Sequence, residues 1–254
     1  MRTSIKTLLA SALVGASALV SVPAFAEETA APGDFTISGY VQGVSDYRFR
    51  GMSASGGDPA IQGAINVNHS SGFYVGAWAS SLEETPTMGS TELDLLAGWT
   101  GEVTPGLTAD VGLTYYVYPS GDVGNANFFE PYASLSTTVG PVEAKAGVSY
   151  SWKQSALLND AGEKDDNLYV YTDLSTGIPN TPVTVAAHLG YTSGPLSPAF
   201  LTSDTGYDGF DYSVGATYNL NKNLSLGVAY LGHDGSNLPS MSNDTAVVTI
   251  KLAL

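Results

Sequence analysis

The 254-residue sequence has no cysteine, only nine Lys and Arg residues against 24 Asp and Glu, and just one long uncharged apolar run, near its start. Without cysteine, the chain has no disulfides, thiolate metal sites or cysteine nucleophile. The formal net charge of −15 argues against nucleic-acid binding, because few cations are available to meet phosphates. A mean hydropathy of +0.06 argues against a bundle of membrane-spanning helices, which needs repeated apolar runs of about 20 residues.

The first residues have the features of a secretory signal peptide. Arg2 and Lys6 form a positive start, the stretch 8–22 is apolar, and Ala24-Phe25-Ala26 matches a small-residue cleavage site. The alternative is a membrane anchor, for which the apolar stretch is short. We therefore expect three parts, namely a cleaved signal peptide for export through the Sec pathway at 1–26, a short linker at 27–33 and a single β-barrel at 34–254.

From residue 34 onward, apolar residues recur with a period of two. Phe35, Ile37 and Val41 share one face of the first segment, whereas Thr36 and Gln42 lie on the other. This alternation is typical of β-strands, and no segment shows the spacing of an amphipathic helix, so we expect no helix in the mature chain. Twelve strands are predicted at 34–44, 60–69, 72–81, 91–100, 106–118, 128–138, 141–152, 167–177, 182–191, 210–219, 223–231 and 245–254.

A soluble sandwich or a soluble up-and-down barrel would also contain such strands. Two features favour a barrel that crosses a membrane. The predicted connections alternate between about 9 to 18 residues and about 2 to 5, as in outer-membrane barrels. Apolar-face aromatics also fall at strand ends, where membrane interfaces would lie. The sequence therefore predicts an all-β, transmembrane, antiparallel up-and-down β-barrel of about 12 strands, with short periplasmic turns and longer extracellular loops.

Charged residues within the predicted strands lie on the face opposite the apolar stripe. In a membrane barrel this face lines the lumen. The predicted pore-lining acids are Glu92, Asp94, Asp110, Glu130, Glu143, Asp173 and Asp211, and the predicted pore-lining bases are Lys145 and Lys251. Because acidic side chains on a confined wall concentrate cations, a conducting barrel should favour them.

Several short segments between residues 45 and 78 resemble those of a known family. They are SDYRFRG at 45–51, Ser53, DPAIQG at 58–63 and HSSGFYVGAW at 69–78. On these segments the chain resembles the TorF-type porin family, also described as Gcw_chp outer-membrane proteins. The resemblance implies a Gram-negative bacterium, an outer membrane with lipid and lipopolysaccharide around the barrel, insertion by the barrel-assembly machinery, and a pore function.

Tyr47, Arg48 and Arg50 leave the outer end of the first strand and form a possible constriction. In one interpretation both arginines fold inward over the acidic lumen and narrow it. In the other they pair with loop carboxylates or with lipopolysaccharide phosphates. Arginine suits all of these oxyanion partners, so the sequence leaves both interpretations open.

Catalytic and metal sites have weak support. His188 lies on the inward face next to Asp211 and Ser213, a combination that can form a nucleophile, base and orienting acid, but inward Ser and Asp are abundant here. The acidic segment 159–166 lacks the spacing of a calcium-binding EF-hand loop. We therefore expect no catalytic residue, no metal and no cofactor.

The function that follows is a porin-like outer-membrane channel for passive diffusion of small solutes or ions. One alternative is a plugged structural or surface-interaction barrel, since many inward residues are bulky tyrosines. A barrel enzyme is the other alternative. A twelve-stranded lumen lies between the filled eight-stranded case and the wide porins, so its width alone does not decide between these functions.

Overall fold

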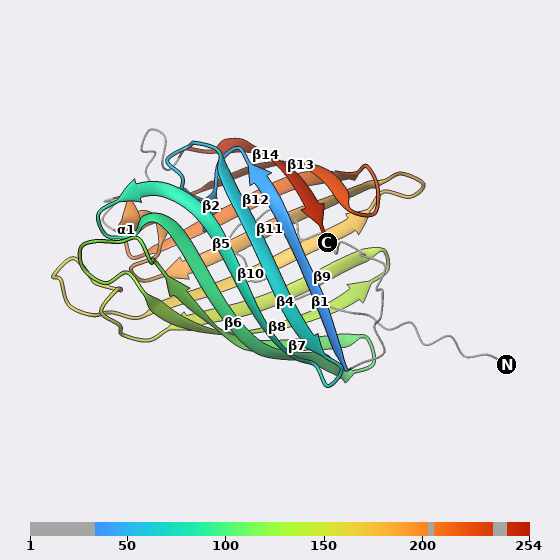
Figure 1. Cartoon of the computed structure of the whole chain (residues 1–254), viewed down its shortest axis with the longest axis horizontal. Coiled ribbons are helices and arrows are strands. Elements are labelled where there is room, and N and C mark those ends of the chain that lie inside the picture. Colours follow the sequence, from blue (N-terminus) through green and yellow to red (C-terminus); the bar gives the residue numbers. More distant parts are fainter. Residues whose placement is uncertain (1–33, 203–205, 236–242) are drawn as a thin grey trace.

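The computed structural model describes residues 34–202, 206–235 and 243–254. The predicted signal peptide at 1–26 and linker at 27–33 lie outside these ranges. Twelve antiparallel strands form a closed barrel (Figure 1), as the sequence predicts. They are β1 (Phe35–Val44), β4 (Ala60–His69), β5 (Phe73–Thr85), β6 (Gly89–Thr104), β7 (Leu107–Val117), β8 (Phe128–Val139), β9 (Val142–Ser151), β10 (Asn167–Gly177), β11 (Val183–Ser193), β12 (Asp208–Asn219), β13 (Leu224–His233) and β14 (Thr245–Ala253).

Each strand pairs with its neighbour in the chain, and β1 closes the sheet by pairing with both β4 and β14. Closure gives the backbone groups on both sides of each strand a partner and leaves no free sheet edge. We call the end of the barrel that carries the short turns, such as 105–106 and 140–141, the turn end. The opposite end, which carries the segment 45–59 and the other long connections, is the loop end.

Three sequence expectations need correction. A four-residue helix, α1 (Pro198–Leu201), occurs where no helix was expected. Ser197 caps it by accepting a hydrogen bond from the backbone of Phe200, and one turn is too short to show an apolar period. The predicted connection at 82–90 is mostly strand, because β5 and β6 stay paired as far as Thr85 and Gly89. Segment 45–59, expected as a loop, contains a small hairpin of β2 (Arg48–Phe49) and β3 (Met52–Ser53).

The burial of side chains is inverted relative to a soluble protein. Large apolar side chains point outward and are exposed, reaching 72% for Ile37 and 71% for Ile61. Polar and charged side chains point inward and are buried, including Gln62, Glu92 and Asp94. A soluble barrel would bury its aliphatic face instead. Among the described residues, no helix is long and apolar enough to cross a membrane.

Aromatic side chains lie at both ends of the exposed apolar face. At the turn end, Phe35 and Phe73 are exposed, and at the loop end Tyr115 and Phe129 stack with their ring centroids 4.1 Å apart. Trp152 continues this stack at 6.0 Å from Phe129. The outer surface thus has an aliphatic middle and aromatic ends, as at the two interfaces of a membrane.

Burial of the inward side chains changes along the barrel axis. On β8, Glu130, Tyr132 and Ser134 are buried, Ser136 is half-buried and Thr138 is exposed toward the turn end. On β9 the same trend runs from buried Ser151 to exposed Glu143. The loop half of the lumen is therefore packed with side chains, whereas solvent reaches the inward face at the turn end.

Candidate functional site in the barrel lumen

The segment 45–59 folds into the loop half of the barrel and fills much of it. Its residues Tyr47, Arg48, Arg50 and Met52 are all buried. Internal hydrogen bonds hold its shape, since the Asp46 carboxylate accepts bonds from Arg48 Nε and Ser53 Oγ, both at 2.6 Å. We call residues 45–59 the inner hairpin.

The two arginines of the inner hairpin have different partners. Arg48 forms an ion pair with Asp46 of the same segment and donates from Nη1 to the carbonyl oxygens of Gly51 and Asn243. Arg50 reaches the wall, where its Nη2 lies 2.6 Å from Oε1 of Glu130 on β8. Arg48 therefore pairs with a loop carboxylate, whereas Arg50 pairs with an inward acid of a strand.

Arg50 lies between two aromatic rings. Its guanidinium carbon is 4.8 Å from the centroid of the Phe49 ring and 4.3 Å from that of Tyr169. Burial by itself lowers the pKa of Arg50, but the Glu130 carboxylate raises it, and the net shift is upward from the ordinary value. The guanidinium thus stays charged inside the barrel.

The tip of the inner hairpin lies against the barrel wall across the lumen from Glu130. Arg50 and Gly51 have φ angles of 48° and 81°, in the left-handed region that glycine tolerates best. A Cβ on Gly51 would lie 2.9 Å from the carbonyl oxygen of Gly232 and from Cβ of His233, both at the end of β13. The hairpin therefore crosses the lumen, from Glu130 on one side to β13 on the other.

The predicted inward acids all lie on the lumen face but differ in their surroundings. Glu92 accepts a hydrogen bond from the Tyr47 hydroxyl at 3.0 Å, and Asp110 accepts one from Tyr74 at 2.7 Å. Glu143 is exposed at the turn end. Oδ1 of Asp94 is buried and has no hydrogen-bond partner among the described residues. The lumen therefore holds carboxylates that accept a tyrosine hydrogen bond as well as a carboxylate oxygen with no described partner.

The two predicted inward bases lie near aromatic rings, and neither forms an ion pair with a carboxylate in the described part of the chain. Lys251 Nζ is 4.1 Å from the centroid of the Tyr40 ring, and Lys145 Nζ is 5.7 Å from that of Tyr171. Such cation–π contacts stabilise an ammonium group without cancelling its charge.

His188 lies between two carboxylates. Its Nδ1 is 2.6 Å from Oδ1 of Asp173 and its Nε2 is 3.0 Å from Oδ1 of Asp211. Ser213 is the cross-strand neighbour of His188. However, Nδ1 is directed at Asp173, and Nε2 is within hydrogen-bond distance of both the Tyr169 hydroxyl, at 2.8 Å, and Asp211. Since a general base needs a free nitrogen lone pair toward its nucleophile, this geometry does not build the triad considered from the sequence.

Sequence reasoning missed the pairing of inward tyrosines with glycines. Tyr74 lies opposite Gly98, Tyr132 opposite Gly112, and Tyr171 opposite Gly147 in the strand register. A Cβ on any of these glycines would overlap the tyrosine ring. The alternation within one strand marks these residues as inward, but only the register between strands shows that each glycine makes room for a ring.

A family model described as a bacterial protein of unknown function, Gcw_chp, matches residues 27–252. The chain belongs to the Gcw_chp family. The narrower TorF-type designation stays an expectation. A comparison with curated proteins finds no match.

Solved porin structures share the fold of this Gcw_chp protein. The NanC porin in a rhombohedral crystal form has a TM-score of 0.58 at 12% sequence identity, covering 85% of this chain and 98% of the porin. The KdgM porin in complex with disordered oligogalacturonate has a TM-score of 0.52 at 11% identity, covering 86% and 96%. At these identities the likeness shows the barrel fold.

Proposed function

We propose that this Gcw_chp protein is a small porin-like channel of a Gram-negative outer membrane, through which small solutes or ions diffuse passively. One observation carries the proposal, namely that a closed barrel exposes its aliphatic side chains and buries most of its inward acids. Hydrocarbon is the environment that matches such an outer surface, and a polar lumen gives solutes a path. The shared fold with the NanC and KdgM porins supports the same function.

The proposed placement of the barrel in the outer membrane follows from its aromatic ends. Lipid would surround the aliphatic band, with lipopolysaccharide at the loop end and the turn end in the periplasm. Export through the Sec pathway and insertion by the barrel-assembly machinery would bring the chain there, which fits the signal-like residues 1–26.

The proposed channel favours cations and is narrowed by the inner hairpin. The seven inward acids of the strands outnumber the two inward lysines, so the wall carries an excess of negative charge. Arg50 adds one positive charge to the lumen, but its ion pair with Glu130 offsets that charge locally. Tyr47 and Arg50 form the constriction, while Arg48 holds the hairpin together.

A plugged barrel with a structural or surface role is the second candidate, because the loop half of the lumen is densely packed. Single-channel recording of the refolded protein in a planar bilayer separates the two candidates. A channel gives discrete current steps in 1 M KCl, whereas a plugged barrel that inserts gives none. Insertion is scored independently by protease protection in vesicles, so that a silent bilayer counts against the channel only when the protein is inserted.

A further inference from the structure

One row of paired positions circles half of the barrel and holds a single acid. Successive cross-strand partners in this row are Tyr40, Ala64, Trp78, Asp94, Tyr116 and Phe128, on β1 and β4 to β8. The carboxylate of Asp94 therefore has an aromatic neighbour on each side, Trp78 on β5 and Tyr116 on β7. Directly opposite residues in an antiparallel pair lie about 5 Å apart at Cβ, so their side chains pack together.

Asp94 differs from the other buried inward acids, each of which has an ion pair or accepts a hydrogen bond from a tyrosine hydroxyl. Glu130 pairs with Arg50, and Asp211 pairs with His188. Asp94 is only 1% exposed, forms no ion pair within the described part of the chain, and leaves its Oδ1 without a hydrogen-bond partner there. Glu92, two residues away on the same face of β6, adds a second buried acid.

A second inward polar atom, Oγ1 of Thr114 on the next strand, is also unsatisfied. Thr114 pairs directly with Leu96 on β6 and Glu130 on β8, so it lies diagonally across from Asp94. Thr114 lies on β7, two residues from Tyr116, and is 1% exposed. Its Oγ1 makes no hydrogen bond with any described residue. A buried polar atom without a partner costs about 1–3 kcal/mol, so two such oxygens placed diagonally on β6 and β7 favour a bound hydrogen-bond donor between them.

We propose that Asp94, Thr114, Trp78 and Tyr116 form a binding site for a primary alkylammonium group. This inference rests on the proposed function and names the class of cation that the channel takes. An ammonium N–H donates to Oδ1 of Asp94 and another to Oγ1 of Thr114, while the rings of Trp78 and Tyr116 attract the positive charge. A multidentate metal site is a poorer fit, since no three His, Cys, Asp or Glu side chains are grouped for a metal among the described residues.

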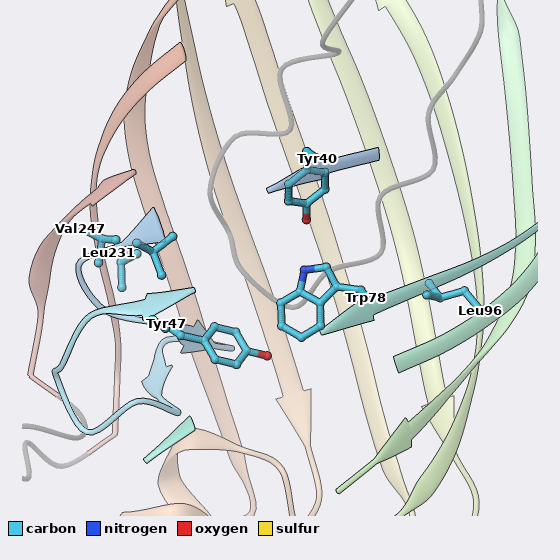
Figure 2. Close-up of a cluster of buried hydrophobic side chains, with 8 residues drawn as sticks. Tyr40, Tyr47, Trp78, Leu96, Leu231 and Val247 are labelled. Atoms are coloured by element: carbon cyan, nitrogen blue, oxygen red, sulfur yellow. The ribbon is translucent and has the colours of Figure 1, made fainter. Parts of the chain in front are cut away.

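Tyr47 of the inner hairpin covers this site. Its ring centroid lies 5.4 Å from that of Trp78, and its hydroxyl is hydrogen-bonded to Glu92. Figure 2 shows Tyr47 directed from the hairpin toward Trp78, with Tyr40 on the other side of the indole. Binding of an alkylammonium beside Trp78 therefore requires the Tyr47 ring to move.

Titration calorimetry of the full-length mature barrel in detergent tests the site without requiring conduction. The probe is n-propylammonium chloride, with KCl at equal ionic strength as the reference. Wild-type protein should bind propylammonium. Asp94→Asn removes a charged hydrogen-bond acceptor and should weaken binding by at least about tenfold. Thr114→Val removes a neutral acceptor and should weaken binding about threefold. Glu84→Gln removes an exposed acid at the loop end of β5, away from Asp94, and should leave binding unchanged.

The outcomes separate this inference from the proposed function. Equal binding by wild type and Asp94→Asn, or no binding by wild type, overturns the site. Full displacement of propylammonium by equimolar K⁺ overturns the organic class. Asp94→Asn is nearly isosteric, and unchanged circular dichroism and heat-modified gel mobility show that the variant is folded. Thr114→Val gives a second test of propylammonium binding at the same site. Absent current steps overturn the channel but leave the binding result standing.

Discussion

Arg50 and Glu130, 80 positions apart in the sequence, form a buried ion pair at 2.6 Å that ties the inner hairpin to the barrel wall. Tyr116 and Ser151 also donate to the same carboxylate, at 3.2 and 3.3 Å. Glu130 thus has three donors from three parts of the chain. The ion pair of Arg50 and Glu130 is the charged contact that joins the hairpin to β8, beside the packing of Phe49 on Tyr116.

Removing Arg50 should loosen the hairpin and widen the lumen. Arg50→Ala leaves Glu130 buried without its cation, and breaking a buried pair in this way costs about 3–5 kcal/mol. Hydration of Glu130 relieves that cost when the hairpin moves aside, so single-channel conductance should rise about twofold. The matched control is Lys153→Ala, which removes an exposed cation paired with Asp165 at 3.4 Å and should leave conductance unaltered. Unchanged conductance in Arg50→Ala would argue against a constriction at this residue.

Adjacent residues on β7 should respond in opposite ways to substitution. Val111 points outward and is 46% exposed, whereas Asp110 points inward and is buried. Val111→Arg places a charge in hydrocarbon and should lower the free energy of unfolding by about 2–4 kcal/mol. Asp110→Asn keeps an acceptor for Tyr74 and should cost less than about 1.5 kcal/mol. Urea unfolding of the barrel in lipid vesicles measures both, and equal losses would contradict the inverted faces.

The glycine opposite each inward tyrosine should be sensitive to a single added methyl group. Gly112→Ala forces the Tyr132 ring to move and should destabilise the barrel by about 1–3 kcal/mol, the usual cost of overpacking. Gly177→Ala is the control, because nothing lies within 4 Å of a Cβ built there. If both variants unfold at the same urea concentration, the ring–glycine packing contributes nothing measurable.

The loop end should face the outside of the cell. The chain has no cysteine, so a single introduced cysteine reports its own accessibility. Asp160→Cys lies in a long connection and should react with a membrane-impermeant maleimide on whole cells, whereas Asn221→Cys lies in a short turn and should react only after lysis. Strong labelling of Asn221→Cys on intact cells would reverse the orientation.

The open channel should select cations over anions. In a KCl gradient near 0.1 M, the reversal potential should have the sign of K⁺ permeation, because the wall carries more acids than bases. The preference should weaken near 1 M KCl, where the Debye length falls to about 3 Å. Chloride selectivity at low salt would show that Arg50 and the two lysines control the lumen.

The strand content and the two faces of the barrel follow from local sequence alone. Each inward acid from Glu92 to Asp211 has an apolar residue on at least one side in the sequence, which indicates a period of two. The predicted bounds of 60–69 and 167–177 match β4 and β10 as a result. The alternating loop lengths and the aromatic strand ends then favour a membrane barrel over a soluble one. The helix α1 escaped prediction because a single turn contains no period.

Which side chains meet inside the lumen was decided by the tertiary structure. The sequence shows that Arg48 and Arg50 leave the first strand together, but their separate partners depend on how the hairpin turns inside the barrel. The row from Tyr40 to Phe128 likewise depends on the register of six strands. Local alternation specifies the face of each residue, whereas the stagger between strands and the path of a folded-in segment arise from contacts between residues far apart in the chain.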